Sequence, residues 1–309
     1  MKTTLRISQG SLQERRFVLP ISCKPAINSA HARRKPPFPS PTRSQTSTKT
    51  EATLKLGGTS FCPTRAKYKK QNQTKKRTHM IIRKRASAMT AAEQTRFKNV
   101  VTRLINAPGD PNPYGNLVWR HTEHAHNMHP FMGSVATQRF LPWHRVYVLK
   151  IEQMGQAIDP LFFIPYWKWT TQRMVPPWLA TFKPTIKVPG PNMTVTRNPP
   201  RPFTTLPTSA QLTTVLAKTT FTPFVVALDA PHGTVHNWCN GTMSNTSYSP
   251  VDPLFWLHHA EIDRIWSQWQ ATHPGLNPSL TGANRIMDPW PETEVAVRSI
   301  AALGYSYGP

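Results

Sequence analysis

Histidine is the residue whose number and spacing first suggest chemistry. Ten of the twelve histidines fall between positions 121 and 273. His232 and His236 are four residues apart, which places two imidazoles on one face of a helix. The adjacent pair His258 and His259 can supply a further nitrogen donor from the next helix. A second set upstream consists of His121, His129 and His144.

Two sets of three histidines favour a binuclear metal site. Neutral imidazoles without thiolate or carboxylate ligands suit zinc, copper or iron, so the ligand type alone does not choose the metal. A zinc metalloprotease would need a glutamate directly after the first histidine of the spaced pair, and Gly233 occupies that position. His124, His126 and His273 are better explained as surface residues or neighbours of ligands, because histidine is commonly half-buried.

Three motifs resemble, in the right order, the copper-binding signatures of the tyrosinase family. They lie at 140–145 (FLPWHR), 231–236 (PHGTVH) and 252–264 (DPLFWLHHAEIDR). This family contains tyrosinases, catechol oxidases and mollusc-type haemocyanins, which hold two coppers in a type 3 centre. The resemblance spans nearly all of 90–309. It implies a mainly α fold, in which an antiparallel four-helix bundle surrounds a dicopper centre.

The resemblance implies three imidazole ligands for each of two copper ions. The implied ligands are His121, His129 and His144 for site A, and His232, His236 and His259 for site B. His258 is expected to be a neighbour of the ligands, because the family usually binds through the second histidine of this pair. The family's usual histidine nine residues before His144 is replaced by Val135. We therefore assign His129 to site A, with His126 as the alternative.

The activity implied by the resemblance is the oxidation of o-diphenols (catechols) to o-quinones with O₂. Relatives that also hydroxylate monophenols resemble each other in having a glutamate ahead of the first site B ligand and an asparagine directly after it. Here the nearest equivalents are Asp229, a shorter carboxylate, and Gly233, which has no side-chain amide. We therefore predict weaker hydroxylation of monophenols such as tyrosine, with Asp229 as the catalytic base. A helix-entry or surface role explains Asp229 equally well.

Phe255 and Gly233 are the predicted substrate-binding residues. Phe255 is four residues before His259, so its ring can lie beside the copper ligands and guide an aromatic substrate by stacking. Two other functions share the same motifs. One is oxidation of o-aminophenols, and the other is haemocyanin-like binding of O₂ without turnover.

Charge divides the chain into two parts. Residues 1–89 hold 21 of the 38 Lys and Arg residues and two of the 14 acidic residues, or +19 of the formal +24. All ten tryptophans lie between Trp119 and Trp290. A segment so basic and so poor in large apolar groups cannot offset its ordering entropy. We predict a disordered basic leader over 1–89 and a dicopper domain over 90–309.

The basic leader has three interpretations. Its lysine and arginine clusters could bind nucleic acid or an anionic membrane surface through counterion release. A solvated segment with no specific nucleic-acid partner is favoured from composition. The acid-poor leader also resembles an organelle transit peptide. No run approaches the ~18 apolar residues of a transmembrane helix. We expect a soluble protein; the sequence does not decide its compartment, of which the cytoplasm is one interpretation, or its oligomeric state.

Helical patterns account for most of the second part. Thr90 and Glu93 form a capping box ahead of an amphipathic helix over 91–106. Further helices are predicted over 117–129, from Pro142 to beyond Met154, and over 209–218, 252–271 and 294–303. Asp252 is expected to cap the helix over 252–271. Residues 174–207 are rich in proline and predict a long irregular loop.

Glu152 is expected to form an ion pair inside the bundle. It lies two helical turns beyond His144, on nearly the same face. Its expected partner is Arg145 or Arg264, because a buried carboxylate needs a nearby cation.

Overall fold

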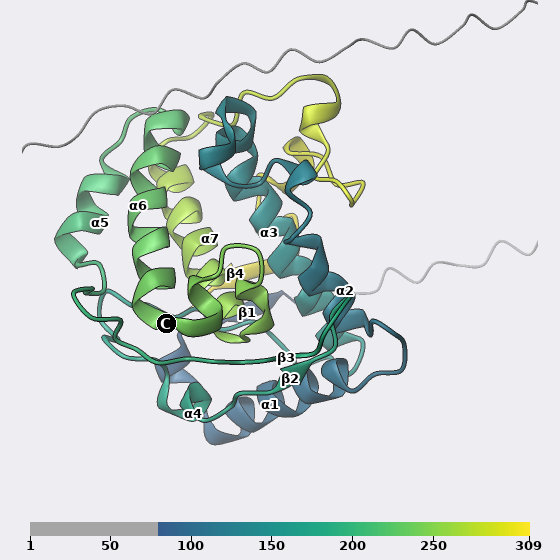
Figure 1. The fold of residues 1–309 in the computed structure, drawn as a ribbon. Helices are drawn as coiled ribbons and strands as arrows, with labels where there is room; N and C mark the ends of the chain where they lie inside the picture. The colour runs from purple at the N-terminus through teal and green to yellow at the C-terminus, as the bar shows by residue number, and fades with distance from the viewer. Residues whose placement is uncertain (1–79) are drawn as a thin grey trace, which may run out of the picture. The chain divides into compact units, whose positions relative to one another are not determined.

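Three long helices form the centre of the fold, and each carries histidines of the two sets. The computed structural model describes residues 80–309, and Figure 1 shows α3 (Ser134–Gln156), α6 (Phe221–Cys239) and α7 (Leu254–Thr272) packed together. The shorter α2 (Pro113–Arg120) lies beside them. The predicted mainly helical bundle is therefore confirmed.

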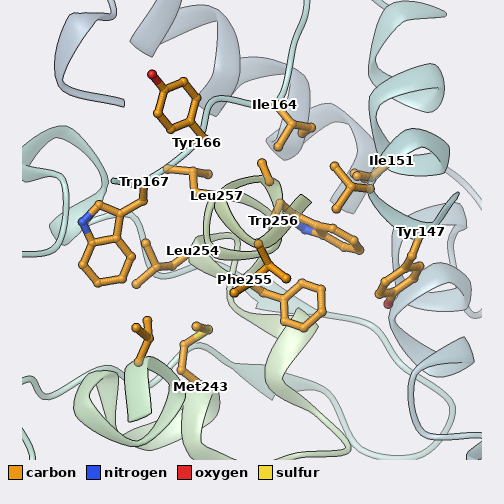
Figure 2. Close-up of a cluster of buried hydrophobic side chains, with 14 of the residues drawn as sticks. Tyr147, Ile151, Ile164, Tyr166, Trp167, Met243, Leu254, Phe255, Trp256 and Leu257 are labelled. Carbon is orange, nitrogen blue, oxygen red and sulfur yellow. The ribbon is translucent and has the colours of Figure 1, made fainter. Parts of the chain in front are cut away.

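Helix α7 is buried along most of its length because apolar residues occupy most of its faces. Every residue from Leu254 to Trp266 is buried. Figure 2 shows Leu254, Phe255, Trp256 and Leu257 pointing in different directions into one continuous cluster. The helix predicted over 252–271 is thus confirmed. A helix that is apolar all round can be stable only inside other elements, so α7 is the axis of the bundle.

Two helices continue through an internal proline, and for one of them the sequence suggested that proline as the helix start. Helix α3 begins at Ser134, eight residues before the predicted start at Pro142, and α6 contains Pro231. Proline in a helix interior removes one backbone hydrogen bond and costs roughly 3 kcal/mol. Burial offsets that cost in α3, since every residue from Arg139 to Leu149 is buried. The predicted start of α3 was wrong because packing outweighed the local proline signal.

Other predicted helices had mixed outcomes. Helix α1 (Ala91–Ile105) begins with the predicted Thr90–Glu93 capping box, and α5 (Ser209–Leu216) matches the helix expected over 209–218. The helix predicted over 117–129 was wrong, because α2 ends at Arg120 and a loop follows. The helix predicted over 294–303 is reduced to one 3₁₀ turn, Val295–Val297.

The chain's remaining elements are short. The proline-rich stretch between α3 and α5 contains α4 (Pro177–Ala180) and the antiparallel pair of β2 (Thr185–Ile186) and β3 (Met193–Thr194). Six further 3₁₀ turns lie within the described range, at Ala86–Ala88, His124–His126, Pro130–Met132, Gly241–Ser244, Ser249–Val251 and Gly282–Arg285. Between residues 80 and 309, none of the helices has both the length and the apolar character needed to cross a bilayer.

The ordered domain begins earlier than the sequence indicated. Strand β1 (Ile81–Arg83) pairs in parallel with β4 (Tyr305–Tyr307). Residues 80–89 were assigned to the disordered leader, so the predicted boundary was wrong for these ten residues; residues 1–79 lie outside the described range. The reason is Arg83, whose fully buried guanidinium binds Glu152 at 2.8 Å. The average composition of 1–89 gave no sign that one of its arginines, Arg83, is buried and paired.

A buried carboxylate on α7 joins both ends of the domain to α3. Asp263 accepts hydrogen bonds from Arg145 at 2.5 Å and from Arg83 at 3.3 Å. The hydroxyl groups of Tyr305 and Tyr307 also donate to Asp263, each at 2.6 Å. Burial alone would raise the pKa of Asp263, but the two guanidinium groups and two hydroxyl groups outweigh burial and lower it.

The ion pairs of this network differ from those predicted. Glu152 was expected to pair with Arg145 or Arg264, and it pairs with Arg83 instead. Arg264 binds Glu261 one turn earlier on α7, at 2.7 Å. The prediction was wrong because it considered only partners inside 90–309.

Removing the carboxylate of Asp263 should destabilise the domain strongly. Asp263→Asn leaves Arg83 and Arg145 buried without a full counter-charge, so we expect a loss of about 3–5 kcal/mol in the free energy of unfolding. Urea titration at pH 7 measures it. The matched control is Asp159→Asn, which removes a partly exposed pair with Arg96 and should cost about 1 kcal/mol or less.

The same variant should change how stability depends on pH. The folded-state pKa of Asp263 is lowered, so its contribution is present at neutral pH and is lost as pH falls below about 4. The difference in unfolding free energy between the native chain and Asp263→Asn should therefore shrink in acid. A difference that stayed constant from pH 7 to pH 3 would contradict this account.

Candidate metal centre

The structure brings seven histidines together as two adjacent groups. In each group the nitrogen donors lie within 4.8 Å of one another. The first group contains His121, His129 and His144, and the second contains His232, His236, His258 and His259. All six residues predicted as ligands therefore lie in one or other group.

Different elements supply the two groups. His121 directly follows α2 as its C-cap residue. His144 lies in the middle of α3, where its neighbours are fully buried. His232 and His236 are one turn apart on α6, as their spacing predicted. The adjacent histidines 258 and 259 lie on α7.

His129 does not lie on a helix. It directly precedes the 3₁₀ turn Pro130–Met132, in an extended backbone conformation. His129 therefore does not have the helical conformation predicted for 117–129. The loop after α2 folds back instead, so that the rings of His121 and His129 meet edge to face at 4.8 Å.

Hydrogen bonds at Nδ1 orient four of the rings. His144 donates to the carbonyl of Phe140 at 2.8 Å, and His236 donates to the carbonyl of Met243 at 2.8 Å. Similar bonds join His121 to the carbonyl of Ser247 (3.3 Å) and His232 to the carboxylate of Asp229 (3.1 Å). A carbonyl or carboxylate can only accept, so Nδ1 carries the proton in each ring and Nε2 carries a lone pair.

These lone pairs converge without a donor between them. Nε2 of His144 lies 3.4 Å from Nε2 of His121, and Nε2 of His236 lies 3.3 Å from Nε2 of His259. The buried Nε2 atoms of His129 and His232 have no hydrogen-bond partner among the described residues. Lone pairs facing each other in a buried site are costly unless a cation lies between them. The geometry fits one metal ion in each group.

Burial favours the neutral form of His129, His144 and His259. It is the main cause that lowers the pKa of His129 to about 3, with repulsion from His232 as the next cause. Burial likewise lowers the pKa values of His144 and His259 well below the ordinary value. Neutral imidazole is the form that binds metal, so the rings are ready as ligands at physiological pH.

The two groups are close enough to form one binuclear centre. The rings of His144 and His259, one from each group, stack at 4.5 Å with an interplanar angle of 17°. Phe255 also stacks on His259, at 4.0 Å with an interplanar angle of 27°. These contacts hold a ring of α3, His144, against a ring of α7, His259, at the place where the two groups meet.

His126, the alternative ligand for site A, lies outside both groups. Its Nδ1 lies 2.5 Å from a carboxylate oxygen of Asp288, and its Nε2 lies 3.0 Å from Glu123. The same Asp288 binds Arg139, whose Nε donates to the carbonyl of His126 at 3.0 Å. Both ring nitrogens of His126 therefore serve to hold the loop that carries His129.

His258 is closer to the metal-binding atoms than the sequence suggested. Its fully buried ring stacks on His232 at 5.4 Å with an interplanar angle of 8°, and it meets His236 edge to face at 4.8 Å. His259 differs, because its Nε2 faces His236 and its ring faces the first group. This difference favours His259 as the third ligand and His258 as a supporting ring.

A cavity of about 190 Å³ opens onto both groups. Asp229 and Gly233, two of the residues predicted to act on the substrate, line it. Phe255 does not, because its ring is fully buried behind His259; the prediction that it stacks on the substrate was wrong. The sequence analysis missed Phe131, which lines the cavity and is 68% exposed. Its only sequence signal was an aromatic residue two positions after a histidine.

Comparisons with known proteins agree with this centre. Residues 111–214 and 184–272 match the model for the common central domain of tyrosinase. A tyrosinase of Streptomyces galbus is 31% identical over 274 residues, covering 70% of this chain and 95% of that protein. Among solved structures, a functional unit of octopus haemocyanin covers 74% of this chain and 68% of its own with a TM-score of 0.57 and 24% identity. A polyphenol oxidase of Vitis vinifera covers 75% and 86% with a TM-score of 0.56 and 19% identity.

Arg139 should be needed to keep site A intact. It is buried and donates to the carbonyls of His126, Asn284 and Ile286, so Arg139→Leu releases the loop that carries His129. We expect bound copper to fall from about two to about one ion per chain, because a loosened ligand shell typically loses 10–100-fold in affinity. Metal analysis after dialysis measures this.

The control for that experiment is Arg120→Leu. Arg120 pairs with Glu123 on the same loop but is largely exposed, so copper content should stay at two. Equal copper loss in both variants would mean that the loop does not depend on Arg139.

The two adjacent histidines of α7 should respond differently to substitution by phenylalanine. His259→Phe removes the nitrogen that faces His236, so about one copper per chain should be lost. His258→Phe retains a flat ring that can stack on His232, so copper content should remain near two. The reverse result would identify His258 as the ligand.

Proposed function

The chain belongs to the tyrosinase family, and from this we propose that it oxidises o-diphenols to o-quinones with O₂. The observation that supports the proposal is the cavity, which opens on histidines of both groups and has a partly exposed wall. Family members bind two copper ions through histidines, and the two groups described above fit that arrangement. Two copper ions held there would supply the redox chemistry that couples oxidation of the diphenol to reduction of O₂.

The residues around the metals have separate tasks in this reaction. The six proposed ligands are His121, His129 and His144 for one ion and His232, His236 and His259 for the other. Asp229 holds His232 through Nδ1 and also lines the cavity, where it can act as a base on a phenol through an ordered water. Buried aromatic rings behind the ligands exclude water.

The same arrangement makes monophenol hydroxylation the weaker activity. Hydroxylation needs a group that removes the phenol proton close to the metal, usually through an ordered water. Asp229 is already bonded to His232 by one oxygen, and Gly233 provides no side chain to hold a water. We infer that diphenol oxidation dominates.

Oxygen uptake tests the proposed function directly. The full chain is loaded with copper and supplied separately with catechol, tyrosine and o-aminophenol in an oxygen electrode. Catechol should consume one O₂ for every two molecules oxidised, giving two o-quinones and two waters. Tyrosine should be slower, and o-aminophenol should not exceed catechol.

Two results would favour the other functions. Reversible O₂ binding without catechol turnover would identify a haemocyanin-like carrier, for which the same copper site is sufficient. An o-aminophenol rate well above the catechol rate would identify an aminophenol oxidase.

Gly233→Asn should raise the ratio of monophenolase to diphenolase activity. A Cβ at position 233 would meet no atom within 4 Å outside its own stretch of helix, so an asparagine fits and its amide can hold a water beside Asp229. One added hydrogen bond in the transition state is worth roughly 0.5–1.5 kcal/mol, or about threefold to tenfold in the ratio. Gly233→Ala is the matched control, since it fills the same space without an amide and should leave the ratio unchanged.

A further inference from the structure

The outer wall of the cavity contains an exposed phenylalanine that the proposed chemistry does not use. Among residues 80–309, Phe131 is the only exposed large apolar side chain that lines this cavity. Its ring stacks on the imidazole of His129 at 5.4 Å with an interplanar angle of 10°. One face of the ring is therefore held by a proposed ligand, and much of the rest remains open to solvent.

The backbone fixes Phe131 in this position. The 3₁₀ turn Pro130–Met132 is closed by a hydrogen bond from Met132 N–H to the carbonyl of His129 at 2.9 Å. A second bond joins Gly133 N–H to the carbonyl of Pro130 at 3.2 Å. Gly133 has a φ of 119°, a value that favours glycine. The turn therefore presents the ring as a preformed apolar surface.

The cavity has one negative charge and no positively charged side chain. Asp229 is its only acidic lining residue, and neither Lys nor Arg is among the described residues that line it. The rest of the wall is polar but uncharged, including Asn237, Ser244 and Thr246. A carboxylate at the mouth of the cavity would meet the Asp229 carboxylate and find no lysine or arginine among the lining side chains to pair with.

Substrate orientation follows from burial. His121 and His129 are only 1% and 4% exposed, so the hydroxyl groups of a phenol must enter first and reach the bottom of the cavity. The ring substituent opposite them then lies at the mouth. Phe131 and Asp229, whose side chain is 35% exposed, are the apolar and the charged lining residue that can meet it there, beside the exposed neutral side chains of Asn237 and Thr246.

We propose that Phe131 and Asp229 select the substrate of this site: phenols whose para substituent is apolar and carries no carboxylate. The inference rests on the proposed oxidation and names its substrate class. Phe131 binds the substituent by apolar contact, and Asp229 repels an anionic one. Both effects act on binding, so they should alter KM more than kcat.

The test compares catechol with two para-substituted catechols of similar length, one with a butyl group and one with a propionate. In the copper-loaded full chain, kcat/KM should rank butyl above unsubstituted and propionate lowest. Phe131→Ala should lower the butyl-to-unsubstituted ratio about threefold to tenfold, because part of the apolar contact is lost. Asp229→Asn should raise the propionate-to-butyl ratio several-fold, whatever it does to the absolute rates.

Two further variants isolate the role of the ring at position 131. Phe131→Leu keeps an apolar side chain and should retain most of the preference for butyl. Phe203→Ala removes a fully exposed phenylalanine that does not line this cavity, so it should leave every ratio unchanged.

A binding measurement separates this inference from the proposed oxidation. 4-Butyl-1,2-dimethoxybenzene has no free hydroxyl group, and its dissociation constant can be followed by tryptophan fluorescence without turnover. Affinity should fall in Phe131→Ala and stay unchanged in Phe203→Ala, even if no catechol is oxidised. Equal affinity and equal ratios in Phe131→Ala and the native chain, or a native preference for propionate, would overturn the proposal.

Discussion

The structure depends on one requirement: in each of the two groups, the buried imidazoles must direct their Nε2 lone pairs at one place, where a metal ion can bind. Four rings meet it in the same way, by donating Nδ1–H to a carbonyl or carboxylate, which leaves Nε2 free. For His144 the acceptor is the carbonyl of Phe140, one turn earlier in its own helix. Backbone carbonyls, and for His232 the carboxylate of Asp229, thus set the direction of these four donors before any metal binds, and little reorganisation is needed on binding.

One ion-pair network holds the helices that carry these rings in position relative to one another. Asp263 is one turn beyond His259 on α7, and Arg145 directly follows His144 on α3. The bond between Asp263 and Arg145 therefore fixes the two helices next to the place where the two rings stack. Arg83 and the tyrosines of β4 complete the network from the two ends of the described range, where Arg83 and Tyr305 are buried. The same set of bonds holds α3 against α7 and joins the two ends of the described range to them.

Features that depend on residues close together in the chain could be predicted from the sequence. The paired histidines on α6 and the buried α7 followed from spacing and from apolar residues on most faces, both short-range properties. His129 could be assigned only from its order in the chain, since the fold of its loop depends on Arg139, Asp288 and a segment about 150 residues away. Arg83 was missed for a similar reason, because its partners Glu152 and Asp263 are distant in sequence. Phe131 stacks on His129 two residues earlier, but its place in the cavity wall depends on residues of α6 about 100 positions away.

The metal centre and the mouth of the cavity are under different physical constraints. Each ligand ring is held by a hydrogen bond or by packing, so a change there disturbs both the metals and the core. Phe131 is mostly exposed, and Gly233 has no atoms near its missing side chain. Substitutions at these two positions should therefore change the free energy of unfolding little, because little buried area is at stake. In the proposed reaction, the residues that bind the metals also stabilise the helical bundle. The residues that select the phenol contribute little to the stability of the fold.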